Sequence, residues 1–358
     1  MKKHIYIDIH AIQTLPPSCV NRDDTGSPKS AVYGGVERAR VSSQAWKHAM
    51  REYFKDIFAP EELGSRTKRI PDRLAEEINR LSPEIGMEKA EKMAMDALKT
   101  IGIKRDDKKK QNAALFFISA VQVEALAKLT VEGEKDKNVY KAALKEHPSF
   151  DIILFGRMAA DDPDLNYDAA SQVAHAISTH AVHTEYDYFT AVDDEQKEDE
   201  AGAGHLGTVE FNSATMYRYA TVNLTELESH LGGDAAKVVR GFAEAFIRSM
   251  PTGKQNTFAN RTLPDMVYIT VRSDQPVNLA GAFEQAIRND RNGYAHRSCE
   301  ELLHYTEKMY STFADRPELA LGCGDSDILN GYAETLPLKN LLERLEEYTA
   351  ALCGKAEE

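Results

Sequence analysis

Residues 215–224, TMYRYATVNL, decide the fold expected for this chain, because side chains of different character alternate along the run. Alternation with a period of two residues is typical of a β-strand whose two faces have different surroundings. Residues 3–11 show the same pattern, with isoleucines on one face and more polar side chains on the other. DMVYITVRS, at 265–273, is a further run typical of a strand. The sequence therefore predicts a sheet assembled from distant parts of the chain.

Helical segments separate these strands. Ser42 or Ser43 supplies an N-cap for a helix that continues through QAWKHAMREYF. The run AAKVVRGFAEAFIRSM, at 235–250, has the spacing of an amphipathic helix. The pattern from about 59 to 150 is helical and highly charged. This segment predicts a large helical insertion after the first strand and helix.

The remaining segments complete the expected fold. DAASQVAHAISTHAV, at 168–182, predicts a helix, and the tail from about 298 is helical and charged. YFTAV and TVEFNS, at 188–192 and 208–213, predict two strands around a loop. The order of elements predicts an α+β fold: a ferredoxin-like βαββαβ core with one helical insertion and one hairpin-like insertion.

Composition and charge restrict the function. The 358 residues carry a formal net charge of −13, which argues against indiscriminate binding of polyanions, because sequence-independent affinity for nucleic acids comes largely from Lys and Arg. Residues 1–55 differ, with nine Lys or Arg against five acids and a net charge of +4. No apolar run approaches the roughly 20 residues needed to span a bilayer, and the start lacks the apolar region of a secretory signal. The four cysteines are widely spaced, which argues against a zinc knuckle and against a disulfide framework. We therefore expect a cytoplasmic protein. Its basic residues should form a local surface near the N-terminus.

Basic and polar side chains are concentrated around the predicted helix start. Gln44, Lys47 and Arg51 are spaced i, i+3 and i+7, so they form one polar stripe that begins at the helix N-terminus. Backbone N–H groups and the positive dipole end of a helix hold phosphate oxygens in proteins. A solvated helix face with loop charges is the alternative interpretation. We define the basic track as Arg22, Lys29, Arg40, Ser42, Ser43, Gln44, Lys47 and Arg51.

The stretch DEAGAGHLGTVEF, at 199–211, contains three glycines in the G-x-G-x-x-G spacing of dinucleotide-binding proteins. That motif needs a buried strand before it and a helix after it, because the pyrophosphate lies on the helix N-terminus. Here an acidic run precedes it, with eight acids and one lysine between residues 185 and 200. Such a field repels a pyrophosphate. The sequence therefore predicts a flexible hairpin tip and no nucleotide cofactor.

Asp23 and Asp24 are candidate metal ligands, since paired carboxylates hold a divalent cation that activates water in nucleases. Adjacent acids in a turn rich in Asn, Gly and Ser more often accept turn hydrogen bonds. His175, His180 and His183 lack the i, i+4 spacing of a helical metal site. The sequence predicts no catalytic residue and no metal, with a metal-dependent RNase at Asp23 and Asp24 as the alternative.

Several motifs together resemble one family. They are SCVNRDDTGSPKSAVYGGVERARVSSQAWKHAMR at 18–51, GRM at 156–158, AHAISTH at 174–180, YFTAVDD and HLGTVEFNSATMYRYATVNL between 188 and 224, and GKQNTFA at 253–259. In this order they resemble the CasC family, the CRISPR-associated backbone subunits of the subtype I-E Cascade complex. The resemblance extends from near residue 1 to about 285.

The resemblance implies a hand-like molecule with an RRM-like palm, helical fingers and a thumb hairpin. It places the palm at 1–57, 169–182 and 212–358, the last part with a helical C-terminal tail. The fingers correspond to 58–168 and the thumb hairpin to 183–211. Several copies would stack head to tail along one CRISPR RNA.

Family roles carry over to matching positions. The basic track would hold RNA phosphates, assisted by Lys254, Gln255 and Asn256 of the GKQ loop, although some relatives have a basic residue where Asn256 stands. Residues beside a displaced nucleotide would be Met158, Tyr188, Phe189, Thr190 and Leu206, with Tyr188 where some relatives have Trp.

The implied function is a non-catalytic scaffold for the guide. Base pairing would read the target DNA while the protein grips the RNA backbone. The expected partners are CRISPR RNA, further copies of the chain, other Cascade subunits and, through the guide, target DNA. No cofactor is implied.

Overall fold

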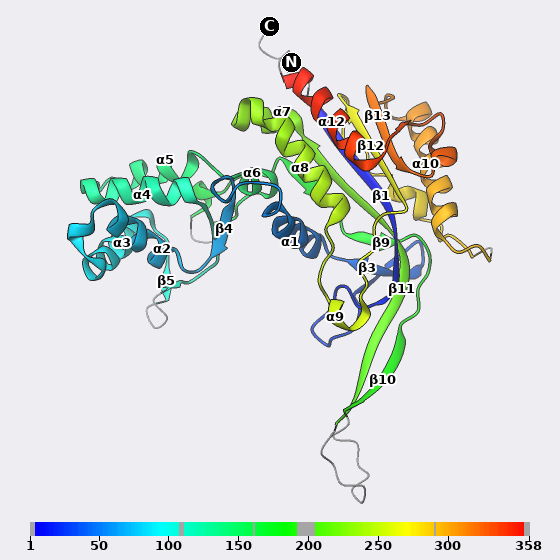
Figure 1. Cartoon of the computed structure of the whole chain (residues 1–358), viewed down its shortest axis with the longest axis horizontal. Coiled ribbons are helices and arrows are strands. Elements are labelled where there is room, and N and C mark those ends of the chain that lie inside the picture. Colours follow the sequence, from blue (N-terminus) through cyan, green and yellow to red (C-terminus); the bar gives the residue numbers. More distant parts are fainter. Residues whose placement is uncertain (1–3, 107–110, 160–161, 192–204, 290, 354–358) are drawn as a thin grey trace, which may run out of the picture. The chain divides into compact units, whose positions relative to one another are not determined.

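A computed structural model describes residues 4–106, 111–159, 162–191, 205–289 and 291–353 (Figure 1). The fold is α+β, and the chain forms two compact units. Unit 1 contains Met1–Glu52, Val173–Thr225 and Ala235–Glu358. Unit 2 contains Tyr53–Gln172 and Glu226–Asp234.

Unit 1 is built around a sheet. In spatial order its strands are β14 (Glu334–Thr335), β13 (Leu319–Gly324), β12 (Met266–Arg272), β1 (Tyr6–Ser18), β11 (His205–Asn223), β9 (Ala176–Ser178), β3 (Val36–Val41) and β2 (Ser30–Tyr33). β13 and β14 pair in parallel, whereas β12, β1, β11, β9 and β3 pair antiparallel with their neighbours. The three alternating segments of the sequence are therefore confirmed as the adjacent strands β12, β1 and β11.

β11 has two roles along its length. Its C-terminal part lies in the sheet beside β1, with Ala220 opposite Ile9. Its N-terminal part pairs with β10 (Glu185–Ala191) and forms a hairpin that extends away from the sheet (Figure 1). The segments predicted as separate strands at 208–213 and 215–224 are thus one continuous strand.

Helices cover both faces of this sheet. They are α1 (Ser43–Phe54), α8 (Ala235–Arg248), α9 (Gln255–Phe258), the 3-10 helix η5 (Leu279–Phe283), α10 (Ala295–Thr312), α11 (Ser326–Leu329) and α12 (Leu338–Cys353). η5 and α10 contribute Phe283 and Leu302 to a buried cluster with Tyr217 and Tyr268 of the sheet. α12 packs against α8, where Arg240 and Glu346 form an ion pair at 3.0 Å.

Unit 2 has its own core. Its elements are β4 (Gly64–Thr67), α2 (Ile70–Leu81), α3 (Met87–Ile101), β5 (Arg105–Asp106), β6 (Gln111–Asn112), β7 (Phe116–Ser119), α4 (Ala120–Glu132), α5 (Lys137–Lys145) and α6 (Phe150–Phe155), and α7 (Leu224–Leu231) crosses the boundary with unit 1. Ile78, Ala94 and Leu126 are fully buried in this core. The expected helical insertion thus also contains short strands.

Two sequence predictions need correction. Residues 168–182 contain no helix; β8 (Ser171–Val173) and β9 lie there instead. The tail after 298 is not wholly helical, because β13 and β14 extend the sheet beyond β12. In both places pairing with a distant strand outweighs the local helical pattern.

Arg218 lies in the core between the sheet and two helices. Its guanidinium carbon is 3.7 Å from the centroid of the Trp46 ring of α1 and 4.4 Å from that of Phe246 of α8. Nη1 donates to the Gln13 side chain of β1 at 2.6 Å, and Nη2 donates to the carbonyl of Phe246. Burial lowers the pKa of Arg218 to about 9. The hydrogen bonds and ring faces offset part of the cost of removing this group from water.

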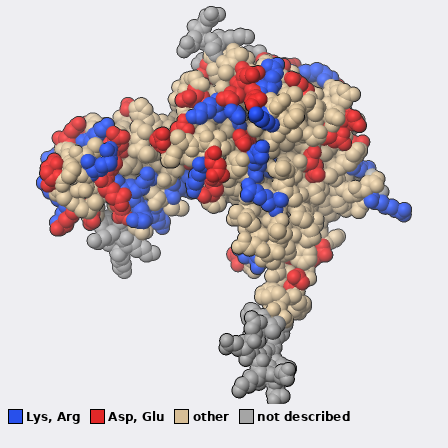
Figure 2. Space-filling view, viewed as in Figure 1, with Lys and Arg blue, Asp and Glu red and all other residues tan. Residues whose placement is uncertain are grey.

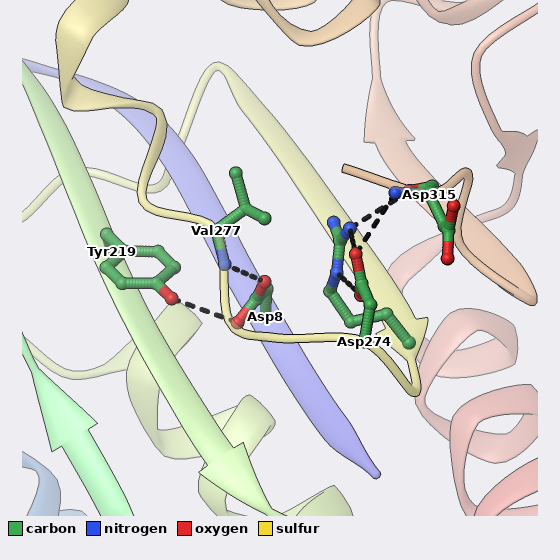
Figure 3. A network of polar contacts seen from close by, with 6 residues as sticks. Asp8, Tyr219, Asp274, Val277 and Asp315 are labelled. Atoms are coloured by element: carbon green, nitrogen blue, oxygen red, sulfur yellow. Dashed lines mark hydrogen bonds and ion pairs between the residues drawn. The ribbon is translucent and has the colours of Figure 1, made fainter. Parts of the chain in front are cut away.

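The opposite face of β1 carries a buried carboxylate. Asp8 accepts hydrogen bonds from the Tyr219 hydroxyl at 3.0 Å and from the Val277 N–H at 2.8 Å (Figure 3). Burial raises the pKa of Asp8 to about 6, against the opposing effect of these hydrogen bonds. Nearby, Arg272 donates two hydrogen bonds of 2.7 Å to Asp274 (Figure 3). Asp8 therefore titrates in a pH range where exposed carboxylates are already ionised.

We predict that Asp8 makes stability depend on pH. Its folded pKa lies above the unfolded value of 3.8, so its contribution is fully present below about pH 4 and is lost as pH rises through about 6. Asp8→Asn keeps the neutral form. The free energy of unfolding of the native chain relative to this variant should fall by about 2 kcal/mol between pH 4 and 7. Chemical denaturation of both proteins across this range measures it, and a pH-independent difference would contradict it.

Candidate nucleic-acid interface

The N-terminus of α1 is held by a side-chain cap. The Ala45 N–H donates to Ser42 Oγ at 3.3 Å, and the Trp46 N–H donates to the Ser42 carbonyl at 3.2 Å. The Ser42 N–H in turn donates to Asn21 Oδ1 at 2.9 Å. The first turn contains no acidic residue, so no carboxylate of its own opposes the positive end of the helix dipole. The sequence left Ser42 and Ser43 as alternative caps, and the structure identifies Ser42 as the cap.

The two faces of α1 differ as its sequence predicts. Trp46 and Met50 are buried, whereas Gln44 is exposed and Lys47 and Arg51 are half-buried. Burial lowers the pKa of Lys47. The buried face fixes the helix against the core, which leaves the polar stripe at its surface.

Arg40 lies in β3 and joins this strand to Lys29 and Ser30 at the start of β2. Its N–H donates to the Lys29 carbonyl at 2.9 Å, its Nε donates to the Ser30 carbonyl at 3.1 Å, and Nη1 lies 3.1 Å from His175 Nδ1. The pKa of His175 is lowered by burial and by the charges of Arg40 and Lys29. A neutral His175 accepts at Nδ1 from the Arg40 guanidinium. Lys29, Arg40 and Asn21 also line one small hollow.

The loop at 253–256 lies directly against the loop that begins at Cys19. A Cβ on Gly253 would be 2.1 Å from the Val20 carbonyl oxygen, so only glycine permits this approach. Burial raises the pKa of the Cys19 thiol, and the charges of Arg22 and Lys254 oppose this effect. Both cations are thus close to the same thiol. Gln255 and Asn256 follow at the surface as the first residues of α9.

The β10–β11 hairpin presents aromatic side chains. Tyr188 is 77% exposed and lies opposite Thr208, and Phe189 is 43% exposed and lies opposite Gly207. A Cβ on Gly207 would be 2.2 Å from the Phe189 ring. Gly207 therefore lets an aromatic ring cross the neighbouring strand. Figure 2 shows mainly uncharged and acidic residues on the described part of this hairpin.

The structure describes only part of the predicted hairpin site. Thr190 is exposed and pairs with Leu206 in the strand register, but the side chain of Leu206 is outside the described part. Gly202, Gly204 and the acidic residues 193–200 also lie outside the described residues.

The GRM motif of unit 2 holds one methionine at the surface. Gly156 has φ +75°, and its Cβ would be 2.8 Å from the Tyr167 carbonyl oxygen. Arg157 is buried and donates to the carbonyls of Leu165 and Leu144, both at 2.9 Å. Met158 is 80% exposed. The first two residues of the motif are therefore structural, and the third is available for contact.

Asp23 is engaged in a turn. Its Oδ1 accepts from the Thr25 hydroxyl at 2.7 Å and from the N–H groups of Thr25 and Ser27 at 2.9 and 3.1 Å. The hydroxyl bond is the main cause of its lowered pKa. In the described part of the chain, no group of three or more His, Cys, Asp or Glu residues could hold a metal ion.

The structure brings together much of the predicted site. Arg22, Lys29, Arg40, Ser42 and Lys254 are linked through Asn21, Cys19 and Val20 within unit 1, whereas Met158 belongs to unit 2. Asn21 and His175 are contacts that the sequence prediction did not assign, although both lie in the family-like motifs. No described helix is long and apolar enough to cross a membrane.

Comparisons with known proteins identify relatives. The family model described as CT1975-like protein matches residues 7–347. A chain of a structure titled "CRISPR RNA-guided surveillance complex, pre-nicking" is 34% identical with a TM-score of 0.83, and the alignment covers 96% of this chain and 100% of that one. A chain of a second structure, titled "CRISPR RNA-guided surveillance complex", is 32% identical with a TM-score of 0.64, covering 96% and 99%. No curated protein matches. The chain therefore belongs to the CT1975-like protein family and is similar over nearly its whole length to subunits of CRISPR RNA-guided surveillance complexes.

Proposed function

We propose that this chain is a non-catalytic backbone subunit of a Cascade complex, of subtype I-E, that binds CRISPR RNA in antiviral defence. One observation carries the proposal: loop, strand and helix residues of the basic track converge on the capped N-terminus of α1. Titles of similar structures that name an RNA-guided complex support it.

This arrangement suits a phosphate backbone. The positive end of a helix dipole and the cations beside it attract phosphate oxygens without contacting bases. Arg40 is oriented by Ser30 and His175, so little side-chain entropy is lost when RNA binds. The guide sequence therefore has no effect on this contact, and the bases remain available for pairing with target DNA.

The fold supports the assignment of parts. The spatial order β12-β1-β11-β9, with α1 after β1 and α8 after β11, is the order expected for an RRM-like palm. On this proposal the β10–β11 hairpin acts as the thumb and unit 2 as the fingers. Several copies stack head to tail along the guide in the cytoplasm.

The thumb would displace one guide nucleotide at intervals. Tyr188 and Phe189 are exposed on β10, and Met158 is exposed on unit 2. Apolar and aromatic surfaces stabilise an unstacked base without reading its identity. Thr190 and Leu206 pair at the same level of the hairpin.

We predict that removing cations from the track, or from the track together with Lys254 beside it, weakens RNA binding at every sequence. Lys47→Ala with Arg51→Ala, and separately Arg22→Ala with Lys254→Ala, should each reduce affinity for unrelated single-stranded RNAs. Each pair should also flatten the slope of log affinity against log salt by about 1.4, because each lost contact releases about 0.7 fewer counterions. Fluorescence anisotropy at several salt concentrations measures both quantities.

The matched control removes the same charge elsewhere in unit 1. Lys308 and Lys339 are exposed on α10 and α12. Lys308→Ala with Lys339→Ala should leave affinity and slope unchanged. An equal loss in this control would mean that overall charge, and no specific track, governs binding.

We predict that Leu206→Asp prevents normal packaging of the guide, because a carboxylate beside a displaced nucleotide is repelled by phosphate and cannot pack against a base. Leu206→Met keeps the apolar contact and should assemble normally. Co-purification of guide RNA, followed by nuclease protection, measures packaging. Normal packaging in Leu206→Asp would count against the thumb assignment.

We predict no Mg²⁺-dependent cleavage of bound RNA, since Asp23 is occupied by its turn. Incubating the RNA-bound chain with Mg²⁺ or with a chelator, followed by gel analysis, tests this. Cleavage that requires Mg²⁺ and disappears in Asp24→Ala would replace the scaffold proposal with the RNase alternative.

A further inference from the structure

Unit 1 contains a second basic hollow, formed by η5, the first turns of α10 and the segment between them. It is open to solvent and has a volume of about 250 Å³. Arg288 lines it from the connecting segment and Arg297 lines it from α10, together with Gln285 and Glu301. None of these residues belongs to the basic track or the hairpin.

Both arginine-bearing stretches are tied to the same residue. The N–H of Ile287 donates to the Thr179 carbonyl at 3.0 Å. The hydroxyl of Ser298 donates to Thr179 Oγ1 at 2.8 Å. Arg288 and Arg297 are the chain neighbours of these two anchored residues. The backbone at each arginine is therefore fixed before any ligand arrives.

A ring contact holds the loop between them. Tyr294 stacks on His180, with ring centroids 3.6 Å apart and 10° between the planes. His180 is itself held, since its Nε2 accepts from the Thr215 N–H at 3.1 Å. The loop between the two arginines is thus connected to β11 through side chains that are already packed.

The two arginines form no ion pair with any residue that the structure describes. Among the described residues, no ion pair involves Arg288 or Arg297, although Arg240, Arg272 and Arg316 are all paired. Both side chains are exposed. Two unpaired guanidinium groups at one hollow attract an oxyanion, and their planar forks match phosphate geometry.

The other lining residues narrow the ligand class. Ala282 and Ile287 give an apolar floor, Gln285 offers both a donor and an acceptor, and Glu301 offers acceptors only. Because Glu301 repels any anionic group placed beside it, the ligand must present a hydrogen-bond donor to Glu301 and its anionic group to the arginines. A nucleotide unit combines a phosphate with hydroxyl or amino donors and an apolar ring face. The volume exceeds what a phosphate group alone requires.

We infer that this hollow binds one ribonucleotide unit, with its phosphate between Arg288 and Arg297 and a hydroxyl or amino group donating to Glu301. The unit comes either from a free nucleotide or from an RNA strand. This site is separate from the guide-binding track of the proposed function and does not depend on it.

Photo-crosslinking of the full chain tests the inference. The probes are 8-azido-AMP and an RNA octamer with one 8-azidoadenosine, and the crosslinked peptide is mapped by mass spectrometry. Crosslinks should map to residues 282–301 in the native chain and in the Arg22→Ala/Lys254→Ala variant. Survival in that variant separates this site from the guide track.

Arg288→Ala with Arg297→Ala should reduce the crosslink at least tenfold, because two charge-assisted hydrogen bonds are lost. Arg291→Ala is the matched control: Arg291 is exposed in the same loop but does not line the hollow. It should leave the crosslink unchanged. Circular dichroism confirms that each variant is folded.

The outcomes separate the two sources and overturn the alternatives. Labelling by both probes supports a free nucleotide, and labelling by the octamer alone supports an RNA strand. Equal loss in Arg291→Ala would overturn the inference in favour of diffuse charge. The absence of a crosslink within 282–301 would also overturn it. Competition by an Asp/Glu octapeptide, with no competition by unmodified AMP or RNA, would overturn it in favour of a protein partner.

Discussion

Arg218 is the contact on which the rest of unit 1 depends. It projects from β11 between Trp46 of α1 and Phe246 of α8, and it bonds to Gln13 of β1. A buried guanidinium is costly unless its donors and ring contacts are satisfied together, so the two strands and two helices must take one mutual arrangement. Because Trp46 lies in the first turns of α1, the same contact determines where the capped N-terminus of α1 points. The candidate interface is therefore positioned by the core.

β11 determines how the hairpin is oriented relative to the sheet. It is one strand of 19 residues, so the part paired with β10 continues directly from the part paired with β1. The pairing of β1 with β11 shifts register between Leu15 and Ser18, where the two parts meet. Register shifts of this kind bend and twist a strand locally. The direction of the hairpin is thus fixed by backbone pairing and does not rely on a flexible hinge at its base.

Much of this was predictable from local patterns. Alternation identified β1, β11 and β12, and Ser42 identified the start of α1, because these signals depend on neighbours within one element. β8, β9 and β13 were not predicted, since their strand conformation comes from pairing with segments far along the chain. The approach of Gly253 to Val20 had no local signal, so the proximity of Lys254 to Arg22 could be expected only by family resemblance. Gly207 is one of the three glycines in the G-x-G-x-x-G spacing, which pointed to a nucleotide site. In the structure, the ring of Phe189 on the opposite strand leaves no room for a side chain at this position.

Charge adds a constraint on the proposed assembly. Each copy carries a net charge of −13, and an RNA adds more negative charge, so long-range electrostatics opposes stacking of several copies. Salt at physiological strength screens this repulsion over about 8 Å, whereas contacts between adjacent cations and phosphates are shorter than that distance. The track holds Arg22, Lys29 and Arg40 close together on an acidic molecule, and Lys254 lies beside it. An acidic chain with a basic track would therefore hold the phosphates of the guide RNA at that track, and the surrounding negative surface would discourage the guide from binding in other orientations.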